Sequence, residues 1–131
     1  MSHSPKVSIV ILNWNGQHYL EKFLPFVLAT QYDNLEVVVA DNGSTDHSVS
    51  FLQEHYPAIR CIILPTNYGF AKGYNEALKQ VEADYYVLLN SDVEVRPGWI
   101  HPMVNLLESD SGIAACQPKI LAYANHKSFE Y

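Results

Sequence analysis

Four short apolar segments, separated by stretches with helical spacing, constrain the fold more than any other feature of this sequence. Each is rich in β-branched or aromatic residues, and its apolar residues follow one another without regular alternation: Lys6–Leu12, Leu35–Ala40, Arg60–Leu64 and Tyr85–Leu89. Near-continuous apolar runs of this length are typical of strands buried on both faces. Because strands and helices alternate in right-handed βαβ units, the sequence predicts an α/β fold with a mostly parallel sheet flanked by helices.

The stretches between these segments carry apolar residues at the spacing of one helix face. The first predicted stripe is Tyr19, Leu20, Phe23, Leu24, Val27 and Leu28. Pro25 lies within it and is expected to kink this helix or to shorten its start. The second predicted stripe is Phe70, Tyr74, Ala77, Leu78 and Val81. Both stripes are expected to pack on the sheet.

Two further helices and a fifth strand complete the predicted fold. A helix that carries Val49 and Leu52 is preceded by side chains that suit an N-cap, namely Ser44, Thr45 and Asp46. Another helix is expected to start at Pro97. Its predicted inward residues are Trp99, Ile100, Met103, Leu106 and Leu107. The segment Gly112–Leu121 is then predicted to form the fifth strand.

The length and composition exclude several classes of protein. A chain of 131 residues suits one domain, residues 1–131, and its 48% hydrophobic and 17% charged residues are typical of a soluble globular protein. The net charge of −6 and the lack of a basic run argue against binding to nucleic-acid phosphates. No apolar run is long enough to span a bilayer, and the N-terminus lacks the apolar core of a signal peptide. Cys61 and Cys116 lie in predicted strands without CxxC spacing, so we expect buried free thiols in a reducing, cytoplasmic compartment.

The loops that follow the first four predicted strands are the expected site. All are polar and rich in Asn, Asp and Gly: Asn13–Gly16, Asp41–Asp46, Pro65–Asn75 and Asn90–Val95. In sheets of this kind, ligands bind beyond the carboxyl ends of the strands. Neither GxGxxG nor GxxxxGK[ST] follows the first strand, so a dinucleotide fold or a P-loop has little support. The sequence therefore predicts one ligand-binding edge of another type.

Individual residues in these loops have competing interpretations. Asp41 ends a strand and is expected to contact a ligand, whereas Ser44–Asp46 is better explained as a turn and helix cap. Lys72 and its neighbouring glycines suit a phosphate, but a plain loop and helix start explains them too. For Asn13–Asn15, capping of their own loop, with Trp14 as core or rim filler, is about as well supported as ligand contact.

Asp92 follows an apolar strand and is a candidate metal ligand. Mg²⁺ and Mn²⁺ are commonly held by one or two carboxylates together with substrate phosphates. Glu94 offers a second oxygen ligand, although the alternation of side chains beyond Asp92 equally turns it to solvent. A structural Asp that caps a turn or pairs with Arg96 is the alternative.

Taken together, the four loops carry a family resemblance. The stretches "VSIVILNWNG", "VVVADNGSTDHS", "NYGFAKGYNEAL" and "YYVLLNSDVEVRPGW", in this order, resemble the nucleotide-sugar-binding half of family 2 glycosyltransferases with the GT-A fold. Their sequences are similar to those of the bacterial rhamnosyltransferase-like branch, which builds cell-surface polysaccharides. The resemblance covers Lys6 to Leu121. It implies a GT-A, Rossmann-like sheet that stops before the acceptor-binding half.

The resemblance also implies roles for individual residues. Those expected to hold the nucleoside are Asn13, Trp14, Asn15 and Asp41, with Asp41 on the base. Those expected near the nucleotide or its phosphates are Asn67, Lys72 and Asn75. The family's DxD position corresponds to Asn90, Ser91 and Asp92, with Asp92 as the ligand of a divalent metal, Mn²⁺ or Mg²⁺. Because Asn90 replaces the first acidic residue, metal binding is expected to rest on Asp92 and on the donor's own oxygens.

The implied activity is transfer of a sugar, with inversion, from a dTDP- or UDP-linked donor to a saccharide or lipid-linked acceptor. The general base is expected beyond Tyr131, and His126 is no convincing substitute because Tyr123–Tyr131 is expected to fray. The chain is thus expected to be an N-terminal fragment of a cytoplasmic enzyme, or of one at the inner face of the membrane. The alternatives are a sugar nucleotidyltransferase, which would show a Gly-rich basic loop after the first strand, and a catalytically silent nucleotide-binding module.

Overall fold

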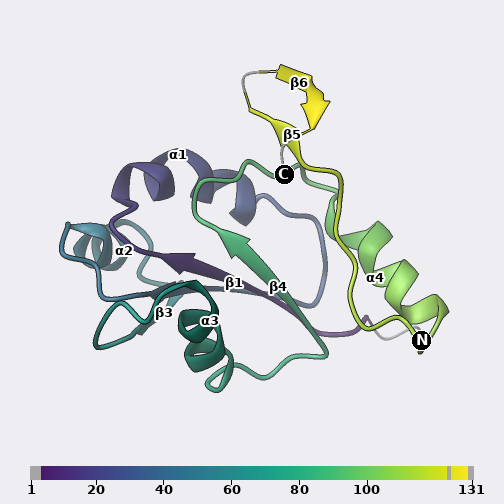
Figure 1. The fold of residues 1–131 in the computed structure, drawn as a ribbon, viewed down its shortest axis with the longest axis horizontal. Coiled ribbons are helices and arrows are strands. Elements are labelled where there is room, and N and C mark those ends of the chain that lie inside the picture. Colours follow the sequence, from purple (N-terminus) through teal and green to yellow (C-terminus); the bar gives the residue numbers. More distant parts are fainter. Residues whose placement is uncertain (1–3, 124, 130–131) are drawn as a thin grey trace.

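A parallel sheet forms the centre of the computed structural model, which describes residues 4–123 and 125–129. The sheet has four strands in the order β3-β2-β1-β4, and all neighbouring pairs are parallel (Figure 1). The bounds are β1 Val7–Asn13, β2 Leu35–Asp41, β3 Arg60–Ile63 and β4 Tyr85–Asn90. Each strand begins and ends within one residue of its predicted position, and the predicted parallel sheet is confirmed.

Helices cover both faces of this sheet. Their bounds are α1 Gln17–Leu28, α2 Ser48–His55, α3 Phe70–Leu78 and α4 Ile100–Ser109. Alternate residues of β1 point to opposite faces, so the core has two parts. In one part Ile9 and Ile11 pack with buried residues of α1, α2 and α4, and in the other Val10 packs with α3. Figure 1 shows α1 and α3 on opposite sides of the sheet.

The expectation that all four strands are buried on both faces holds for only part of the sheet. β1 is almost entirely buried, as is the second half of β2. In contrast, Ile63 of β3 is 57% exposed and Leu88 of β4 is 52% exposed. These strands form the edges of the described sheet, and α3 contacts mainly β1 and β2, so the outer strands lack cover on one face.

The first two predicted helix stripes need correction at their ends. In α1 the residues Leu20, Phe23, Leu24 and Val27 are buried, but Tyr19 and Leu28 are exposed. The helix begins well before Pro25 and continues through it, so the proline does not shorten its start.

In the second stripe Tyr74, Ala77 and Val81 are buried and Leu78 is half-buried, whereas Phe70 is 63% exposed. Phe70 is the first residue of α3, and its ring packs edge-on against the Tyr74 ring, with the centroids 5.1 Å apart, while most of its surface stays exposed.

The prediction was less accurate after β4. α4 begins at Ile100 and not at Pro97, and its buried residues are Ile100 and Val104, whereas Leu106 is exposed. The predicted strand Gly112–Leu121 is wrong, since strand structure begins only at its last residue. Pro118 lacks the N–H that a central strand donates, which disfavours a ladder here.

The chain ends in a short hairpin and not in the main sheet. β5 (Leu121–Ala122) pairs antiparallel with β6 (Asn125–Phe129). The expectation that this terminal segment frays is therefore wrong for the part that the structure describes. His126 lies in β6, and its side chain is outside the described ones.

The prediction of two buried free cysteines in strands is confirmed only in part. Cys61 and Cys116 are free thiols, as predicted, but both are half-buried, and Cys116 lies outside any strand.

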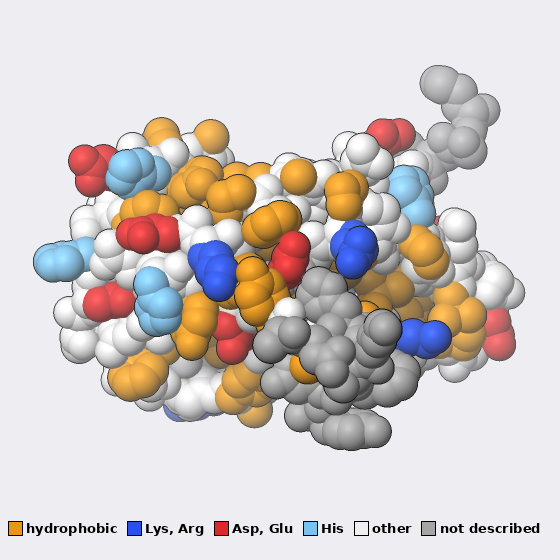
Figure 2. Space-filling model, turned by 90° about the horizontal axis from the view of Figure 1, so that it is seen from above, with side chains coloured by type: hydrophobic (Ala, Val, Ile, Leu, Met, Phe, Trp, Pro, Cys, Tyr) orange, Lys and Arg blue, Asp and Glu red, His pale blue; other side chains and the backbone are white. Residues whose placement is uncertain are grey.

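Viewed from the α1 side, acidic and basic side chains are interspersed with hydrophobic ones (Figure 2). Among the described residues, no helix is both long enough and apolar enough to cross a membrane.

Candidate functional site

The four predicted loops start side by side at one edge of the sheet. We name them L1 (Asn13–Gly16), L2 (Asp41–Asp46), L3 (Pro65–Asn75) and L4 (Asn90–Val95). In the strand register, the last residue of β1, Asn13, lies opposite the last residue of β2, Asp41. The end of β3 lies beside Asp41, and the end of β4 beside Leu12 of β1. The parallel sheet thus brings all four predicted loops together.

Asp41 is buried in a hydrogen-bond network between L1 and L2. Its side chain is 1% exposed, and its carboxylate accepts hydrogen bonds from Asn13 Nδ2 at 3.1 Å, Ser44 Oγ at 2.7 Å and Ser44 N at 2.9 Å. These donors offset the desolvation that a buried carboxylate suffers. Asn13 is also fully buried, and among the described residues its Oδ1 has no hydrogen-bond partner. Asp41 therefore organises the two loops in addition to any ligand contact.

Asn15 links L1 to L2 through its side chain. Its Oδ1 accepts hydrogen bonds from Thr45 N at 2.7 Å and Asp46 N at 3.2 Å, while its own N donates to Ser44 Oγ at 2.9 Å. The residue has a φ of 49°, in the left-handed region that Asn tolerates better than most residues. Asn15 thus caps the neighbouring loop and not its own, while Trp14 is 54% exposed and lies on the rim.

Asp46 bonds to the first residues of two helices. Its Oδ1 accepts from Ser48 N at 2.9 Å and Ser48 Oγ at 2.5 Å, and its Oδ2 accepts from Gln17 N at 3.2 Å. Burial raises the pKa of Asp46, but these hydrogen bonds outweigh it and leave the pKa below its ordinary value. Asp46 thus accepts from the first N–H of each helix, but the prediction that Ser44, Thr45 or Asp46 forms the N-cap of α2 is wrong, since the N-cap is His47.

L3 presents its predicted site residues to solvent. Asn67, Lys72 and Asn75 are all exposed. Lys72 lies in the first turn of α3 with its Nζ 4.6 Å from the centre of the Tyr68 ring. An exposed cation in the first turn of a helix suits an anionic ligand, because the free N–H groups there also carry partial positive charge.

L3 is held in place by Asn42, which the sequence analysis missed. Asn42 is 3% exposed and hydrogen-bonds to Asn67, Tyr68 and Gly69. The sequence feature that could have identified Asn42 is its position directly after Asp41 at the end of β2. In the sequence, however, an Asn before a Gly indicates only a turn.

L4 holds the predicted DxD residues. Asn90 and Asp92 are exposed and Ser91 is half-buried. Asn90 Oδ1 accepts a hydrogen bond from Tyr74 OH at 3.3 Å. A Cβ placed on Gly16 would lie 2.5 Å from Asn13 Oδ1 and 3.0 Å from Ser91 Oγ, so L1 and L4 approach closely at that glycine.

Tyr74 joins α3 to L4 as a neutral hydrogen-bond donor. Burial raises the pKa of Tyr74 to about 12, and the negative charge of Asp92 adds to this effect. The hydroxyl therefore keeps its proton at neutral pH and donates to Asn90.

Asp92 is the side chain in L4 best suited to a cation. Within the described residues, no hydrogen bond or ion pair of Asp92 is found, and the alternative pairing with Arg96 does not occur. No group of three or more potential metal-ligating side chains exists in the described part of the chain. One exposed carboxylate fits Mg²⁺ or Mn²⁺ when most of the remaining ligands come from substrate phosphates and water.

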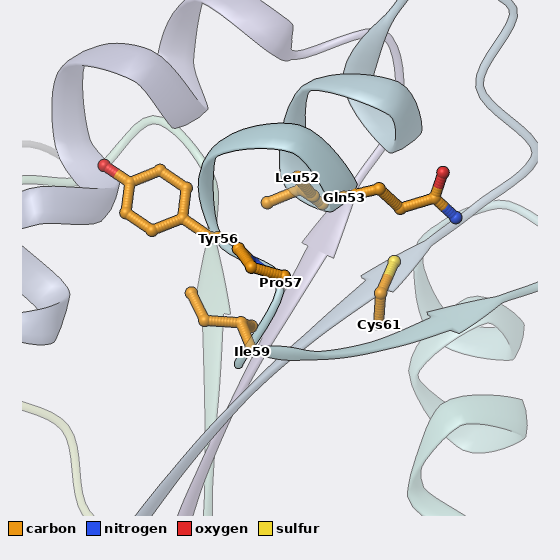
Figure 3. Close-up of a pocket in the computed structure, with 6 residues that line it drawn as sticks. All are labelled: Leu52, Gln53, Tyr56, Pro57, Ile59 and Cys61. Carbon is orange, nitrogen blue, oxygen red and sulfur yellow. The ribbon is translucent and has the colours of Figure 1, made fainter.

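A small pocket lies away from these loops. It has a volume of about 140 Å³ and lies between α2 and the beginning of β3, lined by Leu52, Gln53, Tyr56, Pro57, Ile59 and Cys61 (Figure 3). None of these residues belongs to L1–L4. Burial, together with the charge of Asp41, raises the pKa of the Cys61 thiol, so this cysteine is a poor nucleophile. The pocket is therefore not a candidate active site.

Sequence comparisons point to one family. The profile described as "Glycosyl transferase family 2" matches residues 8–126. An uncharacterized glycosyltransferase of Haemophilus influenzae is 30% identical over 118 residues, which cover 88% of this chain and 36% of that protein. The chondroitin synthase of Escherichia coli is 31% identical over 113 residues, or 84% of this chain and 16% of that protein. The chain thus spans well under half the length of these relatives.

Structural comparisons agree with the observed fold. The mannosyltransferase PcManGT from Pyrobaculum calidifontis, solved in complex with GDP-Man and Mn²⁺, matches 71% of this chain and 29% of its own, with a TM-score of 0.63 and 25% identity. S. aureus TarS 1–349 in complex with UDP matches 88% of this chain and 41% of its own, with a TM-score of 0.69 and 21% identity. The predicted GT-A sheet flanked by helices is confirmed by these likenesses.

Proposed function

This chain belongs to glycosyl transferase family 2, and we propose that residues 1–131 form the nucleotide-sugar-binding part of a glycosyltransferase. The observation that carries the proposal is the meeting of L1–L4 at the carboxyl edge of the parallel sheet. Ligands of open α/β sheets bind at this edge. The described loops combine a buried network around Asp41 with exposed residues that suit a diphosphate and its cation.

The proposed roles follow the positions of the loops. L1 and Asp41 hold the nucleoside, with Asp41 acting on the base and Trp14 on the rim. Asn67, Lys72 and Asn75 lie near the diphosphate, where the charge of Lys72 opposes that of the phosphates. Asn90 and Ser91 contact the donor in L4.

Asp92 holds a divalent cation, Mn²⁺ or Mg²⁺, together with the donor's oxygens. This cation, when bound, stabilises the negative charge that develops on the departing diphosphate.

The proposed reaction transfers a sugar from a nucleotide-diphosphate sugar to a saccharide or lipid-linked acceptor. An acceptor hydroxyl, deprotonated by a base that we place beyond Tyr131, attacks the anomeric carbon opposite the nucleotide, so the configuration inverts. The four loop sequences favour a dTDP- or UDP-linked donor, as in the rhamnosyltransferase-like branch, and a cytoplasmic role in cell-surface polysaccharide synthesis. Because the mannosyltransferase was solved in complex with GDP-Man and Mn²⁺, GDP-linked donors should be tested as well.

The test is a thermal-shift panel of dTDP-, UDP- and GDP-linked sugars, together with the corresponding nucleosides and nucleoside diphosphates, each with and without Mn²⁺. A ligand that binds only the native state raises the melting temperature. We expect one nucleotide to stabilise the protein strongly, with a further gain from Mn²⁺ for the diphosphate but not for the nucleoside. No stabilisation by any nucleotide at millimolar concentration would refute donor binding.

A catalytically silent nucleotide-binding module is the second candidate. It is favoured by one observation, the Asn at position 90 where the family's DxD motif starts with an acidic residue. Both candidates bind nucleotides, so binding does not separate them. Release of free sugar from the stabilising donor, measured over time, would exclude the silent module, whereas binding without release would leave it standing.

A further inference from the structure

Asn42 uses its whole side chain to hold L3. Its Nδ2 donates hydrogen bonds to Asn67 Oδ1 at 3.1 Å and to Gly69 O at 3.0 Å, and its Oδ1 accepts one from Tyr68 N at 3.1 Å. Both amide protons and the amide oxygen are thus engaged with three consecutive residues. The reverse orientation of the amide would place its oxygen against two acceptors. The network therefore determines how the side chain is turned.

Two glycines allow L2, L3 and α3 to pack directly around this side chain. A Cβ on Gly73 of α3 would lie 2.8 Å from Asn42 Nδ2. Gly43 has a φ of +75°, and a Cβ there would lie 2.5 Å from the backbone carbon of Thr66. Since neither site has room for a side chain, the backbones of L2 and L3 are in close contact, and α3 rests on the Asn42 amide.

Asn42 is also anchored on the rigid side of the site. It follows Asp41 directly, and its backbone N donates to Asn13 O at 2.8 Å. Its side chain is 3% exposed and its amide is fully engaged by L3, so it has no free polar group for a ligand. One buried residue thus connects the network around Asp41 to the segment that carries Asn67 and leads into Lys72.

We propose that Asn42 is a positioning residue, which fixes the distance between the nucleoside-binding and the diphosphate-binding parts of the donor site. This inference rests on the proposed function. A donor that spans both parts binds well only if L3 keeps its place relative to Asp41. A nucleoside that occupies only the first part does not depend on L3. Loss of the Asn42 contacts therefore affects the two ligands differently.

The test is Asn42→Asp, which replaces the amide nitrogen by oxygen at almost constant volume and sets a carboxylate against Asn67 Oδ1 and Gly69 O. The dissociation constants of the nucleoside and of its diphosphate are measured by calorimetry in wild type and variant. We expect the constant for the diphosphate to rise about tenfold or more and that for the nucleoside to change by less than about twofold.

A matched control and a second variant support this test. Asn34→Asp makes the same chemical change before β2, where Asn34 Nδ2 donates to Ser4 O at 3.1 Å, and should alter neither constant. Gly73→Ala pushes a methyl group against the Asn42 amide without touching its chemistry, and should reproduce the selective loss. Gly73→Ala replaces glycine inside a helix, where alanine is favoured, so it also serves if Asn42→Asp fails to fold.

The outcomes separate this inference from the proposed function. If wild type binds no nucleotide, the proposed function fails and the positioning role fails with it. If wild type binds the diphosphate but both variants weaken nucleoside and diphosphate equally, or weaken neither, only the positioning role of Asn42 is overturned.

Discussion

The three loops L1, L2 and L3 and the single loop L4 stand at the same edge of the sheet but are built differently. In the first group the buried side chains of Asn13, Asp41 and Asn42 bond the loops to one another, although the predicted site residues of L3 are exposed. In L4 Asn90 and Asp92 are exposed, and among the described residues the Asn90 side chain has one hydrogen bond, from Tyr74.

This difference has an energetic meaning. A network formed during folding is in place before the ligand arrives, so binding there loses little conformational entropy. An open loop with an exposed carboxylate gains its order from the ligand and cation. We therefore expect substitutions of the buried residues in L1 and L2 to lower protein stability as well as affinity, and substitutions in L4 to act on ligand binding alone.

The largest expected effect is that of Asp41→Ala. It leaves the Ser44 amide and hydroxyl without the carboxylate that accepts from them, and leaves Asn13 Nδ2 with only the longer contact to Ser44 Oγ at 3.5 Å. Such a change costs about 1–3 kcal/mol for an unsatisfied buried group. Denaturant titration should show this loss, and calorimetry should show weaker nucleoside binding. Unchanged stability would mean that the network around Asp41 is not formed before the ligand binds. In that case L1 and L2 would not differ from L4 in the way proposed here.

The next effect in size is that of Asp46→Ala, which removes the acceptor shared by the starts of α1 and α2. Loss of a helix cap costs about 0.5–2 kcal/mol. Because the folded pKa of Asp46 is lowered, its contribution is present above the ordinary Asp pKa and is lost as the pH falls through the folded pKa.

The stability difference between wild type and Asp46→Ala should therefore shrink below about pH 4, near the unperturbed Asp pKa. Thermal unfolding from pH 7 to pH 2.5 measures it. A difference that stays constant over this range would show that the carboxylate charge plays no part.

A smaller effect is expected from Tyr74→Phe. Tyr74 belongs to L3 and donates a hydrogen bond to Asn90 of L4, so it connects the two regions. The variant removes the hydrogen bond to the exposed Asn90 and the contact of the hydroxyl with the Leu12 backbone, and leaves the ring in the core. A neutral hydrogen bond of this kind contributes about 0.5–1.5 kcal/mol, and its length and exposed acceptor place it at the lower end. Leu20→Ala, a fully buried core residue on the other face, should cost about 2–5 kcal/mol in the same titration and calibrates it.

The sequence predicted the parts of this molecule that depend on local pattern. The apolar β-branched runs located four strands to within one residue, and their order implied that L1–L4 meet. The sequence prediction failed where the burial of a residue depends on which other parts of the molecule cover it. Leu88 looks like a core residue in the sequence and is half exposed because nothing in the described sheet covers it.

The site shows the same division. Asp41 and Asp92 were found because each follows a strand, which is a local signal. The engagement of Asp41 by Asn13, and of L3 by Asn42, arises from contacts between residues about 25 to 30 positions apart, and no local spacing encodes them. In the sequence Asn42 therefore looks like an ordinary turn residue, and Asp92, although it follows an apolar strand, is exposed.

The smallest expected change in stability, and the sharpest contrast with Asp41→Ala, is that of Asp92→Asn. Because Asp92 is exposed and has no partner among the described residues, the variant should keep its stability within about 0.5 kcal/mol. The same change should abolish the Mn²⁺-dependent part of nucleotide-diphosphate binding and spare nucleoside binding, which depends on the network around Asp41. Glu94→Gln, an exposed carboxylate in the same loop, is the matched control and distinguishes a specific ligand from general negative charge. Calorimetric titration with nucleoside and diphosphate, each with and without Mn²⁺, gives the result. Undiminished metal dependence in Asp92→Asn would remove Asp92 as the ligand, and loss of stability would show that L4 is as tightly built as L1–L3.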